Sequence, residues 1–292
     1  MNSRPTDNNL ERLLLSSCEF GNAEAARRLL LDGANPIFEN SKAIYLAASN
    51  GHADCVELLI AASDARRIPA RALQEAAQNG HSECARLLIP VSNPMVDGSM
   101  ALHMAALYGH VECVELLIPV SEPSADNSSA LSAAAAEGNA ECVALLIPVC
   151  DPKAEQSSAL RSAARKGHAR CVELLIPVSD PTVDGSLPLR LAIENGHYEC
   201  AKLLLPISLP LWSHSEPFEL AVALGHAKIV CLMIESAPGL ASSFAFFDEI
   251  KRASKNGHFE LAALLSSILE QQALSSEISC ERRPAPHFSP RL

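Results

Sequence analysis

The sequence is poor in aromatic residues and holds no long apolar run. Aromatic residues make up 4% of its 292 residues, and there is one tryptophan. Such a composition favours helices that pack through alanine and aliphatic side chains. No segment carries the roughly 20 consecutive apolar residues of a membrane-spanning helix, and residues 1–9 lack the apolar stretch of a secretory signal peptide. We therefore expect a cytoplasmic protein, with export by a route without a cleaved signal peptide as the alternative.

Basic charge and catalytic motifs are also scarce. The chain has 23 Lys and Arg against 34 Asp and Glu, a net charge of -11. Nucleic acids and anionic membranes are bound through Lys and Arg that displace counterions, so this balance argues against both partners. The sequence contains no Gly-x-Ser-x-Gly, no phosphate-binding loop and no His-Glu-x-x-His. It therefore predicts no catalytic residue, no cofactor and no metal site.

What the sequence has instead is an internal repeat. A glycine followed by His or Asn recurs nine times, at Gly21, Gly51, Gly80, Gly109, Gly138, Gly167, Gly196, Gly225 and Gly257. The successive spacings are 30 residues, then 29 six times, then 32. A fixed period near ~30 residues is typical of stacked supersecondary units that share one elongated core, not of one compact domain.

Each period has the pattern of two short helices on either side of the glycine. In the fourth copy, apolar residues recur at helical spacing before and after Gly109: Leu102, Ala105 and Ala106, then Cys113, Val114, Leu116, Leu117 and Ile118. Glycine ends the first helix easily, because it adopts left-handed dihedral angles without penalty. A proline is expected to end the second helix in five copies: Pro90, Pro119, Pro148, Pro177 and Pro206.

This pattern resembles the ankyrin repeat. That family's unit reads Thr-Pro-Leu-His-x-Ala-Ala-x-x-Gly-His, followed by an apolar helix that ends in Leu-Leu. Residues 101–110 match it through Ala-Leu-His-x-Ala-Ala-x-x-Gly-His, and residues 187–197 match it through Leu-Pro-Leu and Gly-His. The resemblance covers about 11–270. It implies an all-α solenoid of stacked helix-turn-helix repeats that takes part in protein–protein interaction.

The copies are shorter than the usual ankyrin period of about 33 residues. The missing residues fall after Leu-Leu-Ile, where the family usually carries a projecting β-hairpin. Only the first copy keeps a similar stretch, at Gly33-Ala34-Asn35-Pro36, and the other links resemble Pro-Val-Ser-Asp-Pro. We therefore predict shortened or absent β-hairpins. The expected binding surface moves from the hairpin tips to the face of the first helices, which the family usually presents on its concave side.

The chain divides into three parts on this basis. Residues 1–10 are predicted to be a flexible N-terminus and residues 271–292 a disordered tail, because both are polar and the tail is rich in proline and serine. The array between them has nine repeats, at about 11–40, 41–69, 70–98, 99–127, 128–156, 157–185, 186–214, 215–246 and 247–270. The first and last copies deviate from the others, as capping repeats do.

Two recurring residue types permit a metal or redox interpretation. Six cysteines lie four residues after a glycine, and seven histidines directly follow one. Packed helices are about 8–10 Å apart, whereas a disulfide needs Cα atoms within about 4.4–6.8 Å. We therefore predict unpaired core cysteines, with Cys280 as the one exposed and reactive thiol. Asn22 and Asn139 replace the histidine in two copies, which favours a polar link at the helix junction over a metal ligand.

Charge along the first helices gives the candidate binding residues. Between Lys153 and Arg190 the sequence has six basic and four acidic residues, a local charge of +2 that leaves -13 for the rest. This segment is a candidate docking patch for an acidic segment of a partner, and a solvated face is the alternative. The candidates are Arg161, Arg165, Lys166 and Arg190, the corresponding upstream residues Tyr45, Gln74, His103 and Tyr108, and the single tryptophan, Trp212. Trp212 alternatively fills an apolar packing position.

The sequence thus predicts a monomeric, non-catalytic scaffold that binds a protein partner of unknown identity through its first helices. Two alternatives stay open. The array is a structural or positioning module that acts through its tails, or it is a bacterial effector or immunity-type inhibitor. A hidden enzyme is disfavoured, because His, Ser and Cys recur in register, whereas an active site is a unique constellation.

Overall fold

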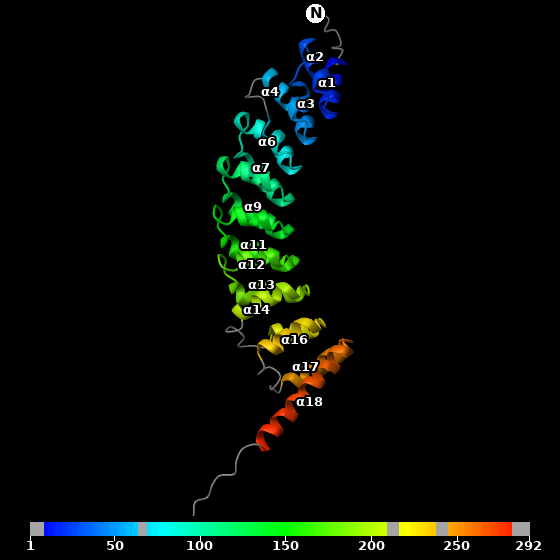
Figure 1. The fold of residues 1–292 in the computed structure, drawn as a ribbon, viewed down its shortest axis with the longest axis vertical. Helices are drawn as coiled ribbons and strands as arrows, with labels where there is room; N and C mark the ends of the chain where they lie inside the picture. Colours follow the sequence, from blue (N-terminus) through cyan, green and yellow to red (C-terminus); the bar gives the residue numbers. More distant parts are fainter. Residues whose placement is uncertain (1–8, 64–68, 209–215, 238–244, 282–292) are drawn as a thin grey trace, which may run out of the picture. The chain divides into compact units, whose positions relative to one another are not determined.

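The computed structural model describes residues 9–63, 69–208, 216–237 and 245–281. Over these residues the chain is helical and forms no strand (Figure 1). The links that are described contain turns and short 3-10 helices in place of β-hairpins. The chain divides into two compact units, Met1–Asp180 and Pro181–Leu292.

The first unit contains six helix pairs. They are α1 (Asn9–Glu19) and α2 (Ala23–Leu31), α3 (Phe38–Ser49) and α4 (Ala53–Ala62), α5 (Ala70–Gln78) and α6 (Ser82–Leu88), α7 (Val96–Tyr108) and α8 (Val111–Leu117), α9 (Ala125–Glu137) and α10 (Ala140–Leu146), and α11 (Ala154–Lys166) and α12 (Ala169–Leu175). The first helix of each pair packs against the first helix of the next, and the second helices pack in the same way (Figure 1).

The second unit contains three helix pairs built in the same manner. They are α13 (Val183–Glu194) and α14 (Tyr198–Ser208), α15 (Glu216–Ala223) and α16 (Ala227–Ser236), and α17 (Ala245–Lys255) and α18 (Phe259–Glu281). Within this unit α13 contacts α15 and α15 contacts α17, so its first helices also form a row.

The core of the first unit is a ladder of leucine and alanine. A fully buried side chain lies seven residues before each glycine, namely Leu14, Ile44, Leu73, Leu102, Leu131 and Leu160. Another buried leucine lies eight residues after the later glycines, namely Leu59, Leu88, Leu117, Leu146 and Leu175. The alanine pairs of the first helices are also fully buried. Their small side chains let neighbouring helices approach closely, as the sequence predicts.

The Gly-His pair joins one repeat to the next. The imidazole of His81 lies over Gly51 of the preceding repeat, so a Cβ atom on that glycine would lie 2.6 Å from Nδ1. Nε2 of His81 donates a hydrogen bond to the carbonyl oxygen of Ser49, 3.1 Å away. Because a carbonyl oxygen only accepts, Nε2 carries the proton. Gly51 also has a φ of 77°, so two independent constraints require glycine there.

The same contact recurs at every junction of the first unit. Nε2 of His52, His110 and His168 donates to the carbonyl oxygens of Glu19, Gln78 and Ala136, at 3.0, 2.8 and 3.0 Å. At the remaining junction Asn139 takes the place of histidine. Its Nδ2 donates to the carbonyl oxygens of Ala106 and Leu107, at 2.9 and 2.8 Å. The polar link that the sequence predicts is therefore confirmed as a hydrogen bond between repeats.

A left-handed turn opens several of the first helices, which the sequence did not reveal. In α9, three consecutive residues, Asp126, Asn127 and Ser128, have φ of 47°, 56° and 62°. The same conformation occurs at 39–41 in α3, 155–157 in α11 and 184–186 in α13. It costs L-residues about 1–2 kcal/mol each, although Asn and Asp tolerate it.

The serine that closes this turn compensates for part of its cost. Ser128 is buried, and its Oγ accepts the backbone N–H of Asp151 from the following link, at 2.9 Å. Ser99 and Ser157 accept the N–H groups of Glu122 and Asp180 in the same way, at 2.8 and 2.9 Å. A serine ten residues before the glycine in several copies is the sequence signal of this second link between repeats.

Two expectations about helix ends are wrong. The sequence predicts a tail from 271, but α18 continues to Glu281, because the first proline after its start is Pro284 and no glycine intervenes. Similarly, α14 continues to Ser208 beyond Pro206. The equivalent Pro90 and Pro119 lie within 3-10 helices, so the chain passes into a tighter turn there. The first helix begins at Asn9, two residues before the predicted start of the array.

Replacing Gln156 by glycine should stabilise the protein. Gln156 is exposed and has φ 55° and ψ 49°, and Gly185 occupies the equivalent position in the second unit. Glycine removes the left-handed penalty, so we expect the free energy of unfolding in urea to rise by up to about 1 kcal/mol. Glu115→Gly, in the right-handed helix α8, is the control and should lower it by about 1 kcal/mol. A loss of stability in both variants would contradict the assigned turn.

Histidine at a junction should be replaceable by asparagine but not by leucine. His168→Asn preserves a donor to the carbonyl oxygen of Ala136, as Asn139 does at the preceding junction. We expect this variant to unfold in urea within about 0.5 kcal/mol of the parent. His168→Leu leaves a part-buried carbonyl without its donor and should lose about 1–3 kcal/mol. Equal losses in the two variants would contradict the hydrogen-bond role.

Candidate functional site

One side chain per repeat forms a row on the face of the first helices. It lies six residues before the glycine, and in the first unit the row is Tyr45, Gln74, His103, Ser132 and Arg161. All five are half-buried. Because each first helix packs against the next, these positions follow one another along the unit. The structure therefore brings together four of the residues that the sequence nominated: Tyr45, Gln74, His103 and Arg161.

Several members of this row reach over the next repeat. The Cζ atom of Arg71 lies 5.1 Å from the ring centroid of Tyr45, a cation–π contact. Nδ1 of His103 lies 3.1 Å from Oγ of Ser129. Burial lowers the pKa of His103, an effect that the nearby Asp126 opposes, so its ring is neutral at pH 7. The row is therefore tied between repeats, and its histidine presents no positive charge to a partner.

The predicted basic cluster on α11 separates into two parts. Nη2 of Arg161 donates to the carbonyl oxygen of Glu155 at 2.7 Å, while its Nε is buried without a hydrogen-bond partner among the described residues. Arg161 therefore braces the left-handed turn of its own helix. Arg165 and Lys166 are exposed in the last turn of α11. Cations there are favoured by the helix dipole, so a purely structural role would also account for them.

The other nominated residues lie elsewhere. Tyr108 is 54% exposed at the glycine end of α7, with its ring stacked against His110 at a centroid distance of 6.5 Å. Arg190 belongs to the second unit, where its Nε lies 3.9 Å from a carboxylate oxygen of Glu194. Trp212 falls outside the described residues. The nominated set is therefore not one contiguous surface within the first unit.

A depression of about 460 Å³ opens between the second and third repeats. Its lining residues are Glu39, Asn40, Lys42, Tyr45, Pro69 and Arg71. It lies where the repeat is irregular, since α5 begins at Ala70 after an extended Pro69 (φ -71°, ψ 138°) and lacks the left-handed turn. Sequence reasoning missed Arg71. Its signal was an arginine where other copies have Met100, Ser129 or Ser158.

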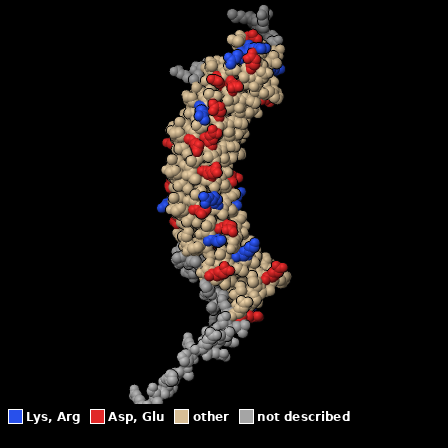
Figure 2. All heavy atoms as spheres, in the orientation of Figure 1, with Lys and Arg blue, Asp and Glu red and all other residues tan. Residues whose placement is uncertain are grey.

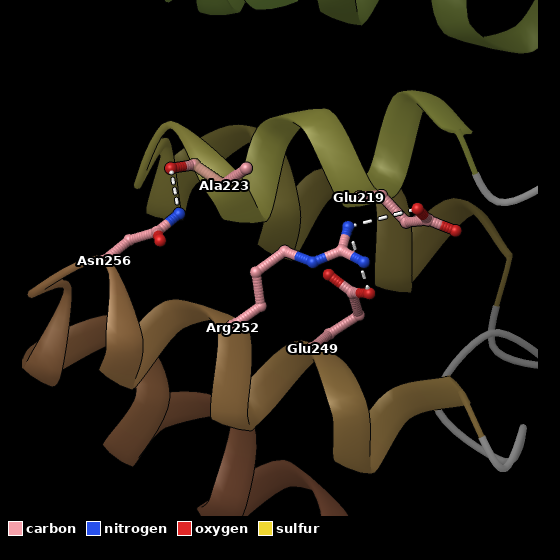
Figure 3. Close-up of polar contacts among 5 residues, drawn as sticks. All are labelled: Glu219, Ala223, Glu249, Arg252 and Asn256. Carbon is pink, nitrogen blue, oxygen red and sulfur yellow. Dashed lines mark hydrogen bonds and ion pairs between the residues drawn. The ribbon is translucent and has the colours of Figure 1, made fainter.

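A charged cluster ties the last repeat of the second unit to the one before it (Figure 3). Nη1 of Arg252 in α17 lies 3.1 Å from Oε2 of Glu219 in α15 and 3.4 Å from Oε1 of Glu249. Glu249 is 3% exposed, and this burial raises the pKa of its carboxyl while Arg252 lowers it. Next to the cluster, Asn256 donates to the carbonyl oxygen of Ala223 at 3.0 Å. The contacts serve packing between repeats.

Sequence reasoning missed Glu249, although the repeat carried a signal. Glu249 lies eight residues before Gly257, where the copies of the first unit from the second onward have a buried alanine, at Ala43, Ala72, Ala101, Ala130 and Ala159. A carboxylate in such a position needs a charged partner. Arg252, one turn later in the same helix, provides it.

The cysteines behave as core residues. None of the nine cysteines described forms a disulfide, and the six that lie four residues after a glycine are buried. Burial raises the pKa of Cys113 to about 11, so this thiol is protonated at neutral pH. The side chain of Cys280 lies outside the described part of the chain. Among the residues that the structure describes, no group of three or more His, Cys, Asp or Glu could hold a metal ion.

These features define a class of protein. It is a helical repeat protein in which the buried packing residues recur from copy to copy, whereas the residues on the first-helix face vary. Models of the ankyrin repeat match residues 43–67 as a single repeat, and 64–129, 102–184, 131–211 and 160–242 as arrays of three copies. The chain belongs to the ankyrin repeat family. The described helices include none that is both long enough and apolar enough to cross a membrane.

One solved structure illustrates the likeness. The chain is similar to the crystal structure of the human ASB11 ankyrin repeat domain, with a TM-score of 0.49 and 21% sequence identity. The match covers 56% of this chain and 82% of that one. No curated protein matches the chain.

The thiol of Cys113 should be inert in the native protein. We expect iodoacetamide at pH 8 to modify Cys113 only on unfolding, as followed by peptide-resolved mass spectrometry, because its pKa of about 11 and its burial both suppress reaction. Half-buried Cys231 is the control and should react sooner. Cys113→Ser should lower the melting temperature, whereas a reducing agent should leave that of the parent unchanged. Rapid native labelling with a reductant-sensitive melting temperature would indicate a redox role instead.

Proposed function

We propose that the protein is a non-catalytic scaffold that binds a partner protein through the first-helix face of its repeats. Ankyrin repeats mediate protein–protein interaction, and the chain belongs to that family. The observation that supports this face is the contrast between positions one residue apart. Six residues before the glycine the side chain changes from Tyr45 to Gln74, His103, Ser132 and Arg161. Seven residues before it, every copy of the first unit keeps a buried leucine or isoleucine.

Charge supports an acidic segment as the feature of the partner that is recognised. Arg165 and Lys166 are exposed side by side at the end of α11. Figure 2 shows basic side chains interspersed with acidic ones on the face that it presents. With a net charge of -11 for the chain, we propose neither a nucleic acid nor a membrane as the partner. The lack of disulfides among the described cysteines favours a reducing compartment, so we propose that the protein acts in the cytoplasm. We also propose that it acts as a monomer.

A second candidate is a positioning module that acts through its C-terminal segment. The length of α18 supports it, since this helix has 23 residues whereas α16 has 10. Deletion of residues 272–292 removes the end of α18 together with the segment after it and separates the two candidates. Partner binding that survives the deletion supports the first-helix face, and binding that is lost with it supports the positioning module. An effector or an inhibitor would act through the same binding.

Charge reversal at the end of α11 should weaken binding without unfolding the protein. Affinity purification of the tagged full chain from its host, followed by mass spectrometry, identifies the partner. Arg165→Glu with Lys166→Glu should then raise the Kd measured by calorimetry by about tenfold or more. The melting temperature should change little, because both side chains are exposed.

The matched control is Arg86→Glu with Arg170→Glu, on the second helices α6 and α12. These side chains are 56% and 69% exposed, and the pair changes the net charge by the same amount. It should leave the Kd nearly unchanged. Equal losses for the two pairs would show an effect of overall charge, and an unchanged Kd for the α11 pair would refute the proposed surface.

A further inference from the structure

We propose that the depression between the second and third repeats binds a carboxylate on an extended acidic segment of the partner protein. The group that carries this inference is the guanidinium of Arg71. The proposal rests on the proposed function and adds to it a position on the array and a ligand chemistry. The contact between Arg71 and the partner's carboxylate would lie in a part of the first-helix face that is distant in sequence from α11.

Among the described residues, none accepts a hydrogen bond from the guanidinium of Arg71. Its side chain is 70% exposed, and Oε1 of Glu75, the described carboxylate oxygen paired with it, lies 3.7 Å from its Nε, beyond hydrogen-bond distance. What holds the guanidinium is the ring of Tyr45, whose centroid lies 5.1 Å from Cζ. A cation–π contact uses the positive charge and leaves the five N–H donors available.

Three other arginines of the first unit use their donors. Nε of Arg28 donates to Oε1 of Glu24 at 3.1 Å, and Nη1 of Arg170 donates to Oε2 of Glu173. Nη2 of Arg161 donates to a backbone carbonyl oxygen. Arg71 is instead positioned by a ring and retains its donors for an incoming carboxylate. A guanidinium in this state favours bidentate binding of a carboxylate.

The lining residues of the depression suit a peptide that carries one carboxylate. Lys42 is paired with Glu39, with 2.9 Å between Nζ and Oε2, and Arg71 lies near the carboxylate of Glu75, so Arg71 would recognise a carboxylate through its hydrogen-bond donors and not through a net charge of the depression. The amide of Asn40 offers a donor and an acceptor to an extended backbone. The faces of Tyr45 and Pro69 suit an apolar side chain next to the carboxylate. A volume of about 460 Å³ is within the ~300–1,000 Å³ of ligand sites.

The irregularity of the third repeat distinguishes this site from the equivalent positions of α9 and α11. At its start Pro69 is extended, and Ala70 takes the place of the serine that accepts a backbone N–H in later repeats. The left-handed turn is absent at Pro69 and Ala70, and Tyr45 lines the depression beside them. In α9 and α11 the turn is present, and Ser129 and Ser158 replace the arginine.

Selection of peptides on the full chain tests the inference before the partner is identified. The probe is a phage-displayed library of random 12-residue peptides, panned on the immobilised protein. We expect the enriched peptides to share an Asp or Glu. Fluorescence anisotropy of the synthesised peptides should show that Arg71→Gln raises the Kd about tenfold or more, and that Arg71→Lys loses much of the affinity because it lacks the fork of donors.

Two further substitutions sharpen the test. Replacing the shared peptide carboxylate by its amide should cause the same loss as Arg71→Gln, and the two changes together should cost little more than either alone. Arg86→Gln, at an exposed arginine of α6, is the matched control and should leave the Kd unchanged. Tyr45→Leu should weaken binding by several-fold, because the guanidinium loses the ring that positions it.

The outcomes separate this site from the proposed function. A selection that yields no binder, enriched peptides without a carboxylate, or an unchanged Kd for Arg71→Gln would each overturn the site. If binding then depends on Arg165 and Lys166 alone, the first-helix face stands and the depression does not. Peptides that are insensitive to all these substitutions would overturn both. Circular dichroism of each variant confirms that the fold is retained, which the exposure of Arg71 leads us to expect.

Discussion

The structure of the first unit depends on one contact, the imidazole or amide of each repeat seated on the glycine of the repeat before it. This contact explains why the glycine is invariant, since a Cβ atom at Gly21, Gly80 or Gly138 would lie 2.5 Å from a histidine Nδ1. It also restrains the period. The donor must reach the carbonyl oxygen two residues before that glycine, so insertions and deletions are confined to the link. The 29-residue copies are short for this family. The described links contain 3-10 helices and turns in place of hairpins, which shortens the copies at the links.

A packing scheme set by the glycine contact and the leucine ladder leaves one face free to vary. Half-buried side chains six residues before each glycine differ in every copy of the first unit. His103 and Ser132 contact the next repeat, whereas Arg161 contacts its own helix. Variation of the backbone is rarer and has larger effects. In the third repeat the left-handed turn is absent at Pro69 and Ala70, and a depression lined by Tyr45 and Arg71 lies there. Function in such an array is expected where a copy departs from the scheme, and the third repeat departs from it in both backbone and charge.

The sequence predicted well the repeated packing positions, but it missed the left-handed turn and the features that occur in single copies. Helix pairs, buried leucines and core cysteines followed from nine copies in register, because each position was seen many times. The left-handed turn was missed because Asp-Asn-Ser also fits an ordinary polar helix start, and only the backbone angles distinguish the two. Arg161 was expected to face a partner, but its contact with the carbonyl oxygen of Glu155 depends on that turn. Glu249 and the extension of α18 to Glu281 lie in the most divergent copy, where register gives the least guidance.

A double-mutant cycle in urea tests the dependence on the glycine contact most directly. Gly138→Ala combines the strain of a residue at φ 81° with a clash against His168. His168→Ala removes the clash and leaves the strain, so Gly138→Ala should cost about 1–2 kcal/mol less in that background. Gly257→Ala, at φ 85° with no atom within 4 Å of the added Cβ, gives the cost of strain alone and should match the reduced value. Additive effects of Gly138→Ala and His168→Ala would contradict the account.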